Sequence, residues 1–160
     1  MTKQEQLQKV FQAYQDEHNG VPAGTMEVAI WGVEKGLLSL PDLNPHAVLA
    51  EQMATALRNE YGTDAKTGRR YRKNHARVIT KYGVQMALWA EMDTAPRDHM
   101  QKAFQQRRKQ IVGDCVQLKA DVDVYNSRNS DKEPIQLVID FTDDVAEVEA
   151  ALDLDLEEAA

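Results

Sequence analysis

The chain has 160 residues, of which 42% are hydrophobic and 28% charged, and its formal net charge is −7. This composition suffices for a globular domain with a core, and the absence of any run of about 18 apolar residues excludes a transmembrane helix. A single cysteine excludes an internal disulfide, and the polar first ten residues are not typical of a secretory signal. We therefore expect a cytoplasmic protein with no membrane partner.

Charge is distributed unevenly along the chain. Residues 58–109 carry 13 basic and 5 acidic side chains, a net charge of +8, whereas residues 1–57 carry −4 and residues 110–160 carry −11. A polyanion responds to the field within roughly one Debye length, about 8 Å at physiological salt, and not to the total charge. The basic middle is therefore a candidate binding surface within an otherwise acidic protein.

The first forty residues predict two amphipathic helices, at residues 3–18 and 25–37, separated by a loop with Gly20 and Pro22. Apolar residues recur at helical spacing in both. The inner face of the first helix is expected to consist of Leu7, Val10, Phe11 and Tyr14. The second helix, with Thr25 as its N-cap, is expected to bury Met26, Ile30, Val33 and Leu37.

A third helix is expected to start at Asn44-Pro45, because asparagine caps a first turn well and proline fits its first position. It should run to about Glu60 with one buried apolar stripe, formed by Leu49, Met53, Ala56 and Leu57. Residues 84–92 then alternate apolar and polar side chains, as a half-buried strand does, although their composition also suits a helix. We favour the strand, paired in a hairpin with residues 70–79 across a turn at 81–83.

A long helix is predicted from about Ala95 to Tyr125. Apolar residues recur along it every seven positions, and a second row, with one arginine, is offset by four positions, as in a coiled-coil seam. A core helix packed on its own chain is an equal alternative. The first row is Phe104, Ile111, Leu118 and Tyr125, the candidate contacts of a homodimer. The second row is Arg108, Cys115 and Val122.

Residues 135–141 alternate like a strand, and an acidic helix capped at Thr142 follows. The predicted fold class is α+β, mainly α. A three-helix unit with a basic β-hairpin precedes one long helix, a short strand and a short C-terminal helix. We divide the chain into residues 1–92, a nucleic-acid-binding unit, and residues 93–160, a dimerisation or partner unit.

The basic region supplies the candidate binding residues. Residues 65–90 contain no acidic side chain, guanidinium groups suit phosphates, and a tyrosine can stack on a base. The candidates are Arg69, Arg70, Tyr71, Arg72, Lys73, His75 and Arg77, with Arg58, Asn59 and Thr55 of the third helix. The alternative is that the acidic last third of the chain neutralises this region. A second basic patch, at residues 105–109, is interpreted as a solvated helix face.

Three helices, the third capped at Asn44, followed by a basic hairpin at residues 69–92, resemble the winged helix-turn-helix family of DNA-binding proteins. The resemblance covers residues 3–92. It implies that residues 44–61 are a recognition helix and that the hairpin is a wing on the DNA backbone. One departure is that Arg58 is the only Arg or Lys of that helix, so the wing would supply most phosphate contacts.

No motif for catalysis, a cofactor or a metal is present. The four histidines include no pair at i, i+4 spacing, and no phosphate-binding glycine loop or nucleophile elbow occurs. Cys115 is expected to be a structural thiol, and helix capping explains Asp140, Asp143 and Asp144 better than a metal does. We therefore expect a DNA-binding regulatory or accessory protein, without enzymatic activity, that binds duplex DNA. The alternative is a non-enzymatic adaptor or assembly protein acting through the long helix and the acidic C-terminal region.

Overall fold

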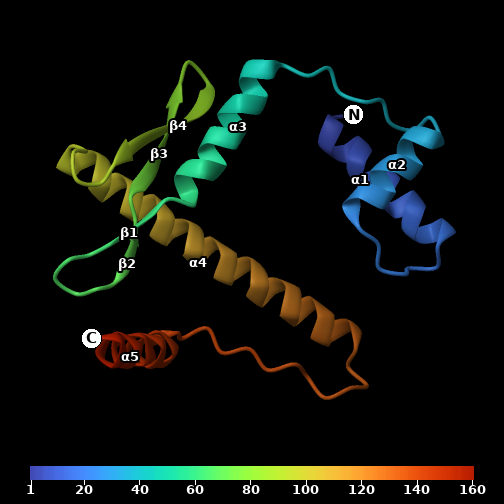
Figure 1. Cartoon of the computed structure of the whole chain (residues 1–160). Helices are drawn as coiled ribbons and strands as arrows, with labels where there is room; N and C mark the ends of the chain where they lie inside the picture. The colour runs from blue at the N-terminus through green and yellow to red at the C-terminus, as the bar shows by residue number, and fades with distance from the viewer. The chain divides into compact units, whose positions relative to one another are not determined.

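The computed structural model describes all 160 residues and divides them into two compact units, residues 1–51 and residues 52–160 (Figure 1). Five helices contain more than half of the residues, and four strands form two separate antiparallel hairpins. This confirms the α+β, mainly α fold class. The unit boundary falls inside the third helix, whereas the sequence division was placed at residue 92. None of the helices has the length and apolar character needed to span a membrane.

The first unit is built on α1 (Lys3–Glu17) and α2 (Thr25–Glu34). Helix α1 starts with a capping box, in which the Glu5 amide donates to Thr2 Oγ1 and the Thr2 amide donates to the Glu5 carboxylate. The Tyr14 hydroxyl donates to Glu27 across the two helices, at 2.7 Å. The buried apolar side chains of this unit are Val10, Tyr14 and Val28.

Helix α2 turns a different face inward than its sequence pattern predicted. Its buried residues are Val28 and Gly32, while Met26 and Ile30 are 74% and 52% exposed. The reason is Gly32, since a Cβ there would lie 2.8 Å from Leu38 Cδ1 and 2.9 Å from Val10 Cγ1. The missing side chain lets these groups approach the helix backbone, which fixes its rotation. The N-cap is Gly24, not Thr25.

Helix α3 (Pro45–Arg58) begins as predicted, because Asn44 Oδ1 accepts hydrogen bonds from the amides of His46 and Ala47. The prediction of a buried stripe was wrong, since α3 has no buried residue. The last turn of α3 belongs to the second unit, and there the Asn74 side-chain amide donates to the Leu57 carbonyl. Two residues of the predicted stripe, Leu49 and Met53, are 58% and 63% exposed.

The basic region, residues 65–90, contributes strands to two hairpins. Strand β3 (Asn74–Lys81) pairs with β4 (Val84–Glu91) across Tyr82-Gly83, both with positive φ, which confirms the predicted strand and turn. Residues 70–72 were expected to belong to the same strand as residues 74–79. They instead form β2 (Arg70–Arg72), which pairs with β1 (Tyr61–Thr63). Lys73 separates the hairpins, because its amide donates to the Glu60 carbonyl and its carbonyl accepts from the Met92 amide.

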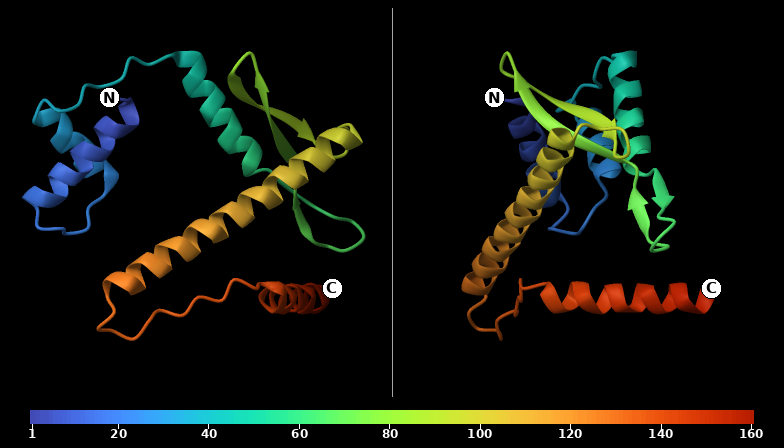
Figure 2. Two further views of the ribbon diagram at one scale, coloured as in Figure 1. Left: turned by 180° about the vertical axis from the view of Figure 1, so that it is seen from behind. Right: turned by 90° about the vertical axis from the view of Figure 1, so that its left-hand side faces the viewer.

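The long helix α4 (Arg97–Arg128) is confirmed, but the strand predicted at residues 135–141 was wrong. That segment runs as extended chain without a strand partner (Figure 2). The Asn126 side chain occupies both the amide and the carbonyl of Ile135, and no sheet edge pairs with the segment. Helix α5 (Thr142–Ala159) follows directly and, with 18 residues, is longer than expected.

The packing around Gly32 predicts that Gly32→Val lowers the free energy of unfolding of the first unit by about 1–3 kcal/mol, because the branched side chain overfills its contacts with Val10 and Leu38. Gly113→Val is the matched control, since Gly113 is also helical but has no neighbouring atom near its Cβ position. It should change the unfolding free energy by less than about 0.5 kcal/mol. Urea titration followed by circular dichroism measures both, and equal effects would contradict this packing.

Candidate functional site

A cleft of about 580 Å³ opens between the β3–β4 hairpin, the last turn of α3 and the first half of α4. Three arginines from three different elements line it: Arg58 of α3, Arg72 of β2 and Arg107 of α4. None of them forms an ion pair. We call this the arginine cleft; its other lining residues are Asn74, His75, Ala76, Val78, Ala87, Trp89, Ala103, Gln106, Gln110, Ile111 and Asp114.

The cleft exists because α4 docks on the free edge of β3. The Val78 amide donates to Gln106 Oε1 at 2.8 Å, and Gln106 Nε2 donates to the Val78 carbonyl at 2.9 Å. The side-chain amide thus replaces the backbone of a missing neighbouring strand. About two turns closer to the start of α4, His99 Nε2 donates to the His75 carbonyl at 2.9 Å. These contacts set the position of Arg107, the residue after Gln106.

His75 ties β2 to α4 from inside this junction. Its ring is buried, packs edge-on against Phe104 and donates through Nε2 to the Arg72 carbonyl at 2.9 Å. Burial is the largest cause and lowers the pKa of His75. The hydrogen bond to the Arg72 carbonyl opposes it, and the charges of Arg107, Arg72 and His99 add smaller lowering effects. A neutral His75 therefore holds Arg72 in place as a positioning residue.

Two aromatic contacts orient arginines of the basic region. The Arg58 guanidinium lies 5.7 Å from the centroid of the half-buried Trp89 ring. The Arg70 guanidinium lies 3.8 Å from the centroid of Tyr61, across the β1–β2 hairpin. Cation–π contact leaves the guanidinium N–H groups available, so both arginines keep their capacity to donate to an anion.

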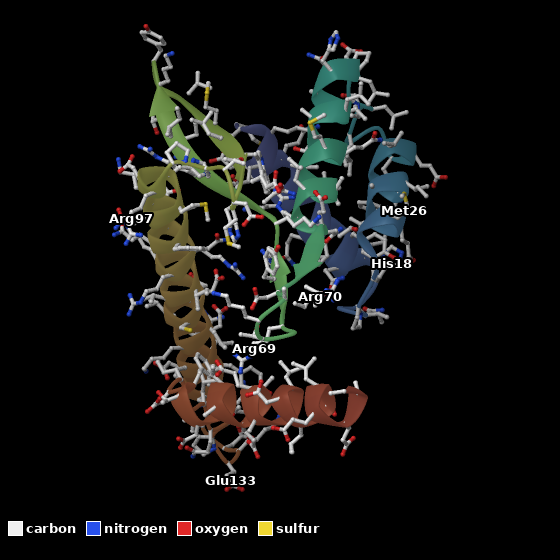
Figure 3. The ribbon with its side chains drawn as sticks, turned by 60° about the vertical axis from the view of Figure 1, so that its left-hand side comes forward. His18, Met26, Arg69, Arg70, Arg97 and Glu133 are labelled. Carbon is white, nitrogen blue, oxygen red and sulfur yellow. The ribbon has the colours of Figure 1, made fainter.

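Arg69 is paired within its own molecule. Figure 3 shows the labelled Arg69 next to α5. The Nε and Nη2 atoms of Arg69 donate to the Asp153 carboxylate at 3.2 and 3.0 Å, and Nη1 lies 3.6 Å from Glu149. Both carboxylates belong to α5, which has eight acidic and no basic side chains, and the Asp153 contact raises the pKa of Arg69. The expectation that the basic region forms no ion pair with the acidic C-terminal region was therefore wrong for Arg69.

The other predicted residues divide between the cleft and its surroundings. Lys73 forms an ion pair with Glu60 at 3.9 Å, and Arg77 forms one with Asp98 at 3.3 Å. Tyr71 packs across Gly62, where a Cβ would lie 2.8 Å from its ring. The structure brings Arg58, Arg72 and His75 together in the cleft, whereas the residues outside its lining are Arg69, Arg70, Tyr71, Lys73, Arg77, Thr55 and Asn59.

Sequence reasoning missed Trp89 and assigned Arg107, in the second basic patch at residues 105–109, to a solvated helix face, whereas Gln106 and Arg107 line the cleft. A signal for Arg107 was present, because Ala103, Arg107, Gln110 and Asp114 recur on one face of a helix. Nothing in the sequence showed that this face meets β3. No group of three or more His, Cys, Asp or Glu side chains is placed to hold a metal ion. Asp140 accepts hydrogen bonds from Thr142 Oγ1 and the Thr142 amide, and these lower its pKa.

Comparison of the chain with models of protein families, with curated proteins and with solved structures finds no match.

The burial of His75 predicts a loss of stability in mild acid. Because its pKa is lowered in the folded state, the unfolded chain binds the proton more readily near its ordinary pKa of about 6.5, and the free energy of unfolding should fall as the pH drops below about 7. His75→Gln should flatten the dependence between about pH 7 and 5.5. His46→Gln, at an exposed histidine of α3, should leave it unchanged. Urea titrations across this pH range measure both, and equal slopes in wild type and His75→Gln would contradict the assignment.

Proposed function

We propose that this chain is a DNA-binding regulatory or accessory protein that holds phosphates in the arginine cleft. The observation that carries the proposal is the convergence of Arg58, Arg72 and Arg107 on one cleft without an ion pair. Three guanidinium groups lining one cleft repel one another unless anions offset their charge, and the lining contains a single carboxylate, that of Asp114. The net charge of −7 makes this concentration of positive charge more notable.

Phosphate is the anion whose geometry fits best. Guanidinium groups donate two parallel hydrogen bonds to phosphate oxygens, and Trp89 offers an aromatic face beside Arg58. Such contacts position a nucleic acid but do not read its sequence. Base readout belongs, in this proposal, to α3 as a recognition helix, where Thr55 is exposed, and to Asn59, which directly follows the helix and is also exposed.

A second candidate is a non-enzymatic adaptor or assembly protein. It is favoured by an apolar groove along α4, lined by Ile111, Val112, Cys115 and Val116 and flanked by Ile139 and Phe141 of the extended segment. The acidic α5 also reaches a basic hairpin through Arg69. The row of apolar positions on α4 that suits a homodimer serves either function; it consists of Phe104, Ile111, Leu118 and Tyr125.

Duplex DNA affinity should depend steeply on salt. Three phosphates bound by the cleft give a slope of log K against log salt of about −2.7, so a fourfold rise in salt weakens binding about 40-fold. Arg107→Ala should reduce the slope by about 1. Arg128→Ala, the same change in the last turn of α4 and outside the cleft, should have no effect. Fluorescence anisotropy between about 50 and 200 mM salt measures this.

Absence of binding to duplex and single-stranded DNA at the low-salt end would overturn the proposal. Equal slopes for Arg107→Ala and Arg128→Ala would show that DNA binds elsewhere on the protein.

The pairing of Arg69 predicts that α5 competes with DNA for this side chain. Asp153→Asn should remove the hydrogen-bonded partner of Arg69, leaving Glu149 at 3.6 Å, and raise DNA affinity by about threefold to tenfold, because one more cation can release a counterion from the duplex. Asp155→Asn removes the same charge from α5 but no contact with Arg69, so it controls for the net charge. Arg69→Ala should abolish the gain. An equal effect of both Asp→Asn changes in the same anisotropy assay would contradict a direct competition.

A further inference from the structure

A row of apolar side chains on α4 lacks cover beyond its contact with β3. Ala103 is the only buried residue of the helix. Further along, Ile111, Leu118 and Tyr125 are 53%, 46% and 49% exposed. Cys115 and Val122 lie between them and are only half-buried. We call these five residues the α4 seam.

The spacing of the seam indicates what covers it. Its residues alternate in steps of four and three, an average of 3.5 per turn, which keeps a stripe facing a second helix that supercoils around the first. The extended segment before α5 runs along one side of the seam: its Ile139 and Phe141 share a groove with Ile111 and Cys115, and its Ile135 and Leu137 share a second groove with Val122. Leu118 and Tyr125 line neither groove. Ile139 and Phe141 remain exposed themselves. The exposed side of the seam therefore has the spacing that suits a second helix.

We propose that this partner is α4 of a second copy of the chain, in parallel and in register. In a parallel pair, a side chain flanking the seam lies opposite the residue five positions later on the other helix. Asp114 is then opposite Lys119 of the second copy. Because the dimer is two-fold symmetric, Lys119 of the first copy is also opposite Asp114 of the second, so the attraction occurs twice. Antiparallel pairing would instead bring Asp114 against Asp114 or Asp121 of the second copy. Charge complementarity therefore selects the parallel arrangement.

The groups needed for this pairing are accessible. Lys119 bonds to Asp123 at 2.6 Å, an exposed pair one turn apart on the same helix, and both side chains are more than half exposed. Exposed pairs of this kind contribute little stability, so Lys119 can exchange its partner readily. Asp114 forms no ion pair within the chain.

The pairing also couples the seam to the arginine cleft; this consequence, unlike the dimer itself, rests on the proposed function. Asp114 is the only carboxylate among the residues that line the cleft, where it opposes binding of an anion. Engaging Asp114 with Lys119 of the second copy offsets that charge. Dimer formation and phosphate binding therefore favour each other.

Cys115 provides a direct test with the unmodified chain. It is the only cysteine, and in the parallel register it lies opposite Cys115 of the second copy across the seam. Mild oxidation of the full-length protein should give a disulfide-linked dimer on a non-reducing gel within minutes, at a yield independent of dilution while the dimer persists. Cys115→Ser should lose the link but keep the dimer mass in sedimentation equilibrium.

Charge reversal separates this dimer from other modes of association. Lys119→Asp should weaken the dimer about tenfold, since both inter-helix attractions become repulsions. The double variant Asp114→Lys with Lys119→Asp should restore the affinity to within about threefold. Lys109→Asp, on the face of α4 away from the seam, should match the wild type.

A monomer by sedimentation equilibrium at all concentrations up to about 100 µM would overturn the proposal, as would a dimer in which the double reversal fails to restore affinity. None of these measurements includes nucleic acid, so their failure leaves the cleft proposal standing. Failure of DNA binding likewise leaves the dimer intact.

Discussion

The second unit depends on the docking of α4 against the free edge of β3. A two-stranded hairpin is marginal by itself, because its outer edges leave backbone groups unpaired and its faces uncovered. Gln106 satisfies the edge at Val78 with both ends of its side-chain amide, and His75 buries its ring against Phe104. These contacts stabilise the hairpin and, by the same geometry, place an arginine from α4 opposite arginines from α3 and β2. The cleft is thus a consequence of how the hairpin is supported.

Around this junction, the arginines of the basic region fall into two groups, those without an ion pair and those paired with a carboxylate. The arginines that line the cleft form no ion pair, and Arg58 among them contacts the Trp89 ring, whereas Arg69 at the hairpin loop is held by α5. An acidic helix on a basic loop lowers the net field that a polyanion meets, so any nucleic acid must compete with α5 for that loop. The chain therefore combines an attractive cleft with a competing carboxylate surface in one molecule.

Burial is sparse beyond these contacts. The buried apolar side chains are Val10, Tyr14, Val28 and Ala103, and no large side chain is fully enclosed. Apolar residues of α4 and α5 face outward instead, and residues 135–141 leave backbone groups without a strand partner. A chain with so little internal packing gains stability most readily from surfaces supplied by another molecule. A paired α4 would supply such a surface where the exposed row is longest.

Local rules in the sequence determined the helices, the hairpin turn and the Asn44 cap, because capping, periodicity and turn chemistry involve residues close in the chain. These local rules gave wrong predictions where contacts with residues distant in the sequence determine the structure. The rotation of α2 follows from the close approach that Gly32 permits, and residues 135–141 stay out of any sheet because no strand edge meets them. The sequence alone determined that residues 58–109 are basic. Only the tertiary structure decided which arginines converge and which one is neutralised, since that depends on contacts between α3, α4, α5 and the hairpins that no local pattern encodes.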